Sequence, residues 1–153
     1  MRIRLEGGLP FVTVSLSHRG RDLILDRILL DTGSGASVFS ADEVAQLGIV
    51  PEPTDVLRRV VGVGGTEFVF AKRIGRLVLG DLEASDFEIQ IGSMDYGFPI
   101  QGLVGMDFLL RSAAFIDLGR LVISRGNPAF QDFADTEEDL YSLEDGEPFS
   151  DHE

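Results

Sequence analysis

The sequence contains no cysteine and no tryptophan, and its only histidines are His18 and His152. Without cysteine, the chain has no disulfide, no thiol nucleophile and no thiolate ligand for zinc. The two histidines lie in a predicted turn and close to the last residue, which argues against a histidine-ligated metal or a Ser-His-Asp triad. We therefore expect no cofactor and a chemistry based on carboxylates.

Long hydrophobic runs are also lacking. No segment reaches the roughly 18 apolar residues that a membrane-spanning helix needs. Residues 1–4, with the sequence Met-Arg-Ile-Arg, do not resemble the apolar stretch of a signal peptide. These features predict a cytoplasmic protein with no membrane partner.

Basic residues are scarce relative to acidic ones, and the imbalance is concentrated at the C-terminus. Ten of the 26 acidic residues follow residue 130, where no Lys or Arg occurs, so the net charge of −13 reduces to −3 without them. This composition predicts one domain over residues 1–128 and a disordered acidic tail over residues 129–153. We expect the tail to promote solubility rather than to bind a partner. An acidic tail would repel phosphates, and no basic patch is apparent, so we expect no nucleic-acid partner.

The apolar pattern is that of many short strands. Alternation of apolar and polar residues at 11–17 and 87–91 predicts half-buried strands. Further strands are predicted at 23–30, 38–39, 56–59, 66–70, 76–79, 114–117 and 121–124. Ser40 and Glu43 have the spacing of a helix start, and that helix should end near Gly48. The sequence therefore predicts an all-β, barrel-like domain with one or two short helices.

The most informative segment is residues 28–34, Ile-Leu-Leu-Asp-Thr-Gly-Ser. Its apolar residues predict a buried strand that delivers Asp31 into a tight turn. Burial disfavours an ionised carboxylate, whereas hydroxyls and backbone N–H groups in the turn stabilise one, so the environment can shift its pKa in either direction. That is the setting of a catalytic acid or base, although from these residues alone an ordinary surface turn is an equal alternative.

This segment resembles the active-site loop of retropepsins, the retroviral type of aspartic protease, and of their bacterial relatives. The family motif is two apolar residues followed by Asp-Thr/Ser-Gly-Ala/Ser, and the matching residues are Leu29, Leu30, Asp31, Thr32, Gly33 and Ser34. Residues 60–65 resemble the family's flap, with a plain β-hairpin as the alternative. Residues 102–105 resemble its apolar-apolar-Gly element, which leads into a helix. The parts follow one another in the family's order over residues 10–124.

The resemblance implies a retropepsin-like closed barrel and an aspartic endopeptidase that cleaves peptide or protein substrates. Two carboxylates share one proton in such enzymes. This chain contains a single Asp-Thr-Gly, so the second Asp must come from another copy in a homodimer.

The resemblance also assigns roles to individual residues. Asp31 is the catalytic residue, Thr32 hydrogen-bonds to the partner's loop, Gly33 allows close backbone approach and Ser34 hydrogen-bonds the outer carboxylate oxygen. The flap residues are Val61, Gly62, Val63, Gly64 and Gly65, and they close over the substrate. Leu103 and Val104 support the active-site loop.

The sequence departs from the retroviral pattern at two places. Retroviral enzymes pair an acidic residue just after the loop motif with an Arg after the apolar-apolar-Gly element. This chain has Gly35, Ala36 and Ser37 in the first segment and Met106 and Asp107 in the second. We therefore expect this link to be missing. The acidic tail also predicts a rearranged dimer interface, because it does not readily supply a strand.

Two other functions are compatible with the residues. One is a non-catalytic retropepsin-like dimerisation or peptide-binding module, which an Asp31→Asn variant would distinguish from an enzyme. The other is a carbohydrate-active enzyme, which would need two acids of one chain about 5–9 Å apart. Asp107 is the other acid in an apolar, glycine-rich setting, but an acid in the first turn of a helix is its simpler role.

Overall fold

The computed structural model describes residues 1–62 and 65–126. The predicted acidic tail and the flap residues Val63 and Gly64 lie outside these ranges. The strands are β1 (Arg4–Glu6), β2 (Leu9–His18), β3 (Arg21–Leu30), β4 (Val38–Ser40), β5 (Leu57–Gly62), β6 (Gly65–Leu79), β7 (Leu82–Gly92), β8 (Gly102–Val104), β9 (Ala114–Asp117) and β10 (Val122–Arg125). The helices are α1 (Ala41–Val44), which continues as the 3-10 turn η1 (Ala45–Leu47), and α2 (Met106–Arg111).

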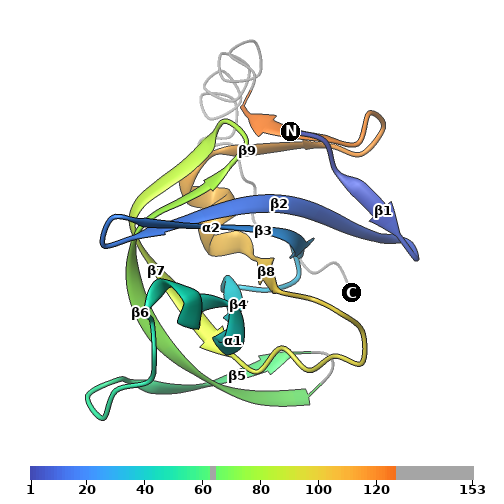
Figure 1. The fold of residues 1–153 in the computed structure, drawn as a ribbon. Helices are drawn as coiled ribbons and strands as arrows, with labels where there is room; N and C mark the ends of the chain where they lie inside the picture. The colour runs from blue at the N-terminus through green and yellow to red at the C-terminus, as the bar shows by residue number, and fades with distance from the viewer. Residues whose placement is uncertain (63–64, 127–153) are drawn as a thin grey trace, which may run out of the picture.

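Six of the strands form a closed ring (Figure 1). Their order is β2, β3, β8, β4, β7 and β6, and pairing of β2 with β6 closes the ring. The β3–β8 and β4–β7 pairs are parallel and the other pairs of the ring are antiparallel. This arrangement confirms the predicted all-β, retropepsin-like barrel with short helices.

Alternating apolar residues direct the strands around one core. In β2, the side chains of Val12, Val14 and Leu16 are buried, while the residues between them are half-buried. Closure of the ring requires β6 to approach β2 at Gly75, where a Cβ atom would lie 3.2 Å from the backbone oxygen of Ser17. The structure has one strand over residues 65–79, where the sequence predicted two, because the charged residues in its middle continue the sheet.

The first helix begins and ends where the sequence predicted. Gly48 follows η1 with a φ of 76°, a left-handed conformation that glycine adopts without strain. Ser40 precedes α1, but its hydroxyl makes no capping hydrogen bond. The side chain of Ser40 is buried at the end of β4, so the predicted position is right and the predicted contact is wrong.

The N-terminal residues pair with β10 of the same chain. The amide of Ile3 donates to the oxygen of Leu121 at 2.8 Å, and the amide of Ile123 donates to the oxygen of Met1 at 2.8 Å. β10 in turn pairs with β9, so these segments form a small sheet near the N-terminus (Figure 1).

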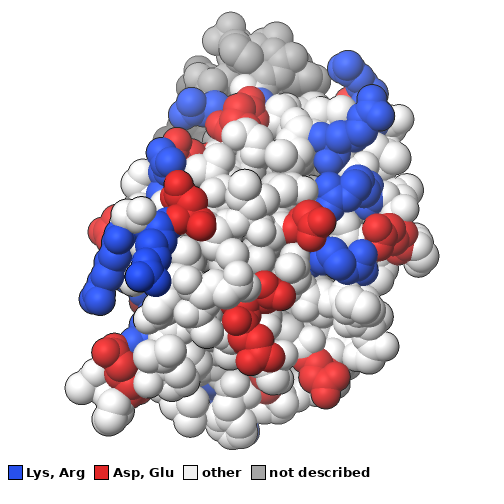
Figure 2. Space-filling view, viewed as in Figure 1, with Lys and Arg blue, Asp and Glu red and all other residues white. Residues whose placement is uncertain are grey.

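Charged side chains of both signs are mixed on the face shown in Figure 2. On this face, Lys and Arg lie mainly at the left and right, each group beside Asp or Glu, and further acidic side chains lie in the lower middle. None of the described helices has the length and apolar character needed to cross a membrane.

Candidate functional site

The loop that carries Asp31 is anchored by two parallel strands. Leu30, the last residue of β3, pairs with Val104 of β8. The amide of Asp31 then donates to the oxygen of Val104 at 2.9 Å. Val104 is fully buried, whereas Asp31 is half-buried. The buried strand pair therefore fixes the backbone of the loop and leaves the Asp31 carboxylate at the edge of the core.

The carboxylate of Asp31 is held by the turn that follows it. The amide of Gly33 donates to Oδ1 of Asp31 at 3.0 Å, and the amide of Ser34 donates to the backbone oxygen of Asp31 at 3.2 Å. A Cβ atom at position 33 would lie 3.2 Å from Oδ1, which is why glycine suits this position. Within residues 1–62 and 65–126, Oδ2 accepts no hydrogen bond, so it is available to a water molecule or a second carboxyl group.

Ser34 does not make the contact that the resemblance implied. Its hydroxyl donates to the backbone oxygen of Ala36 at 2.7 Å rather than to Asp31. The backbone oxygen of Ser34 accepts a hydrogen bond from the amide of Met106 at 2.8 Å. Ser34 therefore holds the loop against the start of α2, because the turn through Gly35 brings the Ala36 carbonyl within reach.

Asp107 links the two segments that the retroviral ion pair would join. Its Oδ2 accepts from the amide of Ser37 at 3.0 Å, and its Oδ1 accepts from the Ser37 hydroxyl and the Phe108 amide, both at 2.7 Å. The Ser37 hydroxyl also accepts from the amide of Gly105 at 3.0 Å. The retroviral ion pair has no counterpart at these positions, and a carboxylate on the helix with neutral donors on the loop joins the two segments instead.

Gly105 allows the close approach that this link requires. A Cβ atom at position 105 would lie 2.4 Å from the backbone oxygen of Ala36, well inside contact distance. The loop, β8 and α2 therefore form one packed unit behind Asp31.

A cavity of about 660 Å³ lies in front of this unit. Of the residues predicted for the site, the lining includes Asp31, Gly33, Ser34, Val61, Gly65 and Leu103. Thr32 is exposed at the tip of the turn, Val104 lies buried behind the loop, and neither of them lines the cavity. Its apolar wall consists of Leu29, Val38, Val60, Phe98 and Ile100.

Two further acidic residues, Glu67 and Asp95, line this cavity, and no sequence motif pointed to them. Glu67 lies on β6, in the hairpin predicted as the flap. Its Oε1 accepts hydrogen bonds from the Ser93 amide at 3.0 Å, the Ser93 hydroxyl at 3.2 Å and the Met94 amide at 3.4 Å. Its Oε2 accepts from the Tyr96 hydroxyl at 3.0 Å. The Glu67 carboxylate therefore connects β6 to the loop that follows β7.

Two further features, a close approach at Gly92 and a raised pKa at Tyr96, belong to this connection. A Cβ atom at Gly92 would lie 2.6 Å from Oε1 of Glu67, so a side chain there would displace the carboxylate. The pKa of Tyr96 is raised to about 12, chiefly by burial and also by the hydrogen bond to Glu67 and the charges of Glu67 and Asp31. The phenol of Tyr96 is therefore protonated and donates at any ordinary pH.

The described residues contain no group of three His, Asp or Glu side chains placed to hold a metal ion. What the cavity offers is a carboxylate with one open oxygen, an apolar wall and a β-hairpin along one side. Such an arrangement suits proton transfer to or from an extended ligand.

A solved structure shares the fold of this chain. The solved structure of a retropepsin-like aspartic protease from Rickettsia conorii is similar, with a TM-score of 0.57 and 18% sequence identity over 80% of this chain and 95% of that one. The comparison with curated proteins gives no match. The sequence model of the family described as "Aspartyl protease" matches residues 14–108, which include Asp31, strands β5 and β6 and the start of α2. Since that match covers more than half of the sequence, the chain belongs to the aspartyl protease family.

Proposed function

We propose that this protein is an aspartic endopeptidase whose active site is completed by a second copy of the chain. The observation that carries the proposal is the position and hydrogen bonding of the Asp31 carboxylate. Its carboxylate lines the larger cavity, accepts one hydrogen bond from Gly33 and keeps Oδ2 open to a ligand.

The chemistry requires two carboxylates that share one proton, because like charges about 3 Å apart do not both ionise. The charged carboxylate takes a proton from the attacking water, and the protonated one donates to the carbonyl oxygen of the peptide bond. Glu67 lines the same cavity, but four donors already occupy its oxygens. The geometry therefore favours Asp31 of a second copy as the other member of the dyad.

A two-fold axis beside Asp31 would bring the two loops together. The exposed position of Thr32 at the tip of the turn supports this arrangement, since its side chain is accessible to the partner's loop. We propose that Thr32 hydrogen-bonds across this axis. The pairing of the N-terminal residues with β10 in the same chain supports the predicted rearrangement of the dimer interface.

The hairpin of β5 and β6 would close over a bound peptide. Val60, Val61, Gly65 and Thr66 line the cavity from this hairpin. An extended peptide can hydrogen-bond with the backbone of such a hairpin while alternate side chains enter the apolar wall. We therefore propose apolar substrate residues on both sides of the cleaved bond, in a cytoplasmic setting.

The test is to incubate the wild-type chain and the Asp31→Asn variant with a mixture of peptides and to identify the products by mass spectrometry. The wild type should cleave between apolar residues and be inhibited by a pepstatin-type transition-state analogue, and the variant should do neither. Solution mass should show a dimer for both. Peptide binding by both proteins without cleavage by either would instead identify a non-catalytic peptide-binding module, and cleavage by Asp31→Asn would refute the proposed dyad.

A further inference from the structure

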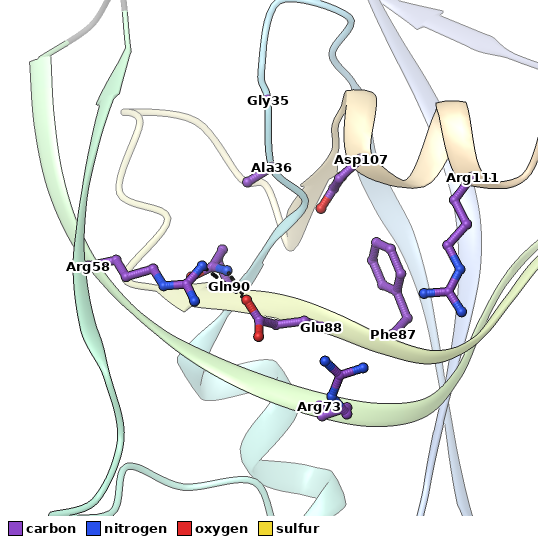
Figure 3. Close-up of a pocket in the computed structure, with 9 residues that line it drawn as sticks. All are labelled: Gly35, Ala36, Arg58, Arg73, Phe87, Glu88, Gln90, Asp107 and Arg111. Carbon is purple, nitrogen blue, oxygen red and sulfur yellow. Dashed lines mark hydrogen bonds and ion pairs between the residues drawn. The ribbon is translucent and has the colours of Figure 1, made fainter.

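A second cavity, of about 340 Å³, adjoins the one in front of Asp31 (Figure 3). The two cavities share Gly35 as a lining residue, so both border the loop that follows Asp31. Three cations line it: Arg58 on β5, Arg73 on β6 and Arg111 on α2. The first cavity, in contrast, contains acidic groups and no basic side chain.

Two of these cations are held side by side. Nη1 of Arg73 donates to the backbone oxygen of Asp86 at 2.9 Å, and Nη1 of Arg111 donates to the same oxygen at 3.5 Å. Arg111 also donates to the backbone oxygen of Ser85 and lies over the ring of Phe87, 5.6 Å from its centroid. Figure 3 shows Arg73 and Arg111 approaching this region from β6 and α2 respectively.

The acidic groups nearby neutralise this pair only in part. Within the described part of the chain, no carboxylate lies within 4.0 Å of Arg111, and Arg73 has only the Asp86 carboxylate at 3.6 Å, which is 78% exposed. Glu88 pairs instead with Arg58 at 3.0 Å, and the oxygens of Asp107 are occupied by donors from the loop and α2. An anion bound between Arg73 and Arg111 would therefore relieve the repulsion between two like charges.

Gln90 supplies an independent sign that a ligand binds here. Its side chain lines the cavity and is 6% exposed. Its Nε2 donates to Glu88 at 3.4 Å, whereas its Oε1 is buried and accepts no hydrogen bond from residues 1–62 or 65–126. A buried acceptor without a donor is unfavourable, and the backbone N–H of a peptide is the kind of group that would satisfy it.

We propose that this second cavity is a specificity subsite for an acidic side chain of the bound peptide. The carboxylate of a Glu or Asp accepts hydrogen bonds from Arg73 and Arg111, whose planar guanidinium groups suit a carboxylate. A turn of the Gln90 amide toward the cavity would let Oε1 accept a backbone N–H of the same peptide. The assignment rests on the proposed peptidase function, because it treats the second cavity as one end of the substrate groove.

The test uses peptides that share one cleavage site and carry Glu or Gln at each successive position outward from it. At one position, the wild type should cleave the Glu peptide about tenfold faster in kcat/KM than the Gln peptide, as two charge-assisted hydrogen bonds allow. In Arg73→Gln and in Arg111→Gln, this ratio should fall toward one. Equal kcat/KM for every Glu and Gln pair would overturn the subsite.

A matched control is Arg76→Gln. Arg76 lies on the same strand as Arg73, is similarly exposed and pairs with Glu83 at the same distance of 3.6 Å, but it does not line the cavity. For this variant, the ratio of kcat/KM between the Glu and Gln peptides should equal that of the wild type. A loss of the ratio in Arg76→Gln as well would mean that overall charge, rather than the subsite, selects the substrate.

Binding to the Asp31→Asn dimer separates this proposal from the peptidase proposal. Fluorescence anisotropy with labelled Glu and Gln peptides should show that Asp31→Asn binds the Glu peptide more tightly. A double variant that carries both Asp31→Asn and Arg111→Gln should bind the two peptides equally. If the wild type cleaves nothing but this difference is present, the subsite stands and the peptidase proposal fails. If cleavage occurs and the difference is absent, the subsite alone is wrong.

Discussion

Two aspartates on neighbouring strand ends have opposite surroundings. Asp31 directly follows β3, and Asp107 lies just beyond β8, the strand paired with β3. Asp107 accepts three hydrogen bonds, from the Ser37 amide and hydroxyl and the Phe108 amide, whereas the Asp31 carboxylate accepts one, from Gly33. A carboxylate whose oxygens are occupied holds a structure together, and one with an open oxygen can exchange a proton with a ligand. The same residue type therefore serves the fold at one position and, as we propose, the chemistry at the other.

The same substitution at both aspartates should have opposite consequences. Asp31→Asn should lower kcat/KM by at least about 10²-fold, because an amide does not act as a general base. Its free energy of unfolding should change by no more than about 0.5 kcal/mol, since the open oxygen makes no contact that is lost. Peptidase assays and urea unfolding measure the two quantities. A large loss of stability in Asp31→Asn would contradict the comparison.

Asp107→Asn should instead lower the free energy of unfolding by about 1–3 kcal/mol, because the amide NH2 group would face a backbone or hydroxyl donor. Urea unfolding of Asp107→Asn, Ser37→Ala and the double variant would measure the coupling between the two residues. Their losses should not add, because both residues belong to one hydrogen-bond network. Strict additivity would show that Ser37 and Asp107 act independently.

Glu67→Gln extends the comparison to a third carboxylate with occupied oxygens. The Gln amide keeps one acceptor oxygen, so β6 should be held less firmly to the loop after β7. The loss of one hydrogen bond of about 1 kcal/mol corresponds to a fall of about fivefold in kcat/KM. Hydrogen exchange at the amides of Ser93 and Met94 should accelerate. Glu83→Gln, on the exposed side of β7, is the matched control and should change neither quantity.

The smallest effect concerns Tyr96, whose folded-state pKa of about 12 exceeds the ordinary value of 10.0. Since the folded chain holds this proton more tightly than the unfolded chain, stability should be unaffected below pH 10 and should decline between about pH 10 and 12. The Tyr96→Phe variant should lack this component of the decline. Tyrosinate absorbance would check the pKa directly: a Tyr96 that titrates near 10 would exclude the hydrogen-bonded, buried phenol.

Much of the barrel could be predicted because its signals are local. Alternation in residues 11–17, the glycine after the first helix and the paired hairpin strands each depend on a few neighbouring residues. The break predicted between residues 70 and 76 was wrong because Lys72 and Arg73 interrupt the apolar pattern, although Arg73 is exposed on β6 and Lys72 is paired with Glu52 and Asp55. A local pattern does not reveal which side of a closed sheet faces water.

The candidate site was predictable only where a motif carries it. Asp31, Gly33 and Leu103 come from contiguous motifs and line the larger cavity. The contacts of Glu67 with Tyr96 and of Ser37 with Asp107 join residues 29 and 70 positions apart. Such contacts depend on how the strands close the barrel, so they leave no periodic signal in the sequence.

The central claim is that two copies of the chain each contribute Asp31 to one active site. Mixing a fixed amount of wild type with increasing amounts of Asp31→Asn, under conditions in which labelled subunits exchange, tests it directly. Activity should fall with the fraction of wild-type homodimer and approach zero at excess variant, because each mixed dimer has only one aspartate at its two-fold axis. Activity that stays constant while the subunits exchange would show that one chain is sufficient and would contradict the account.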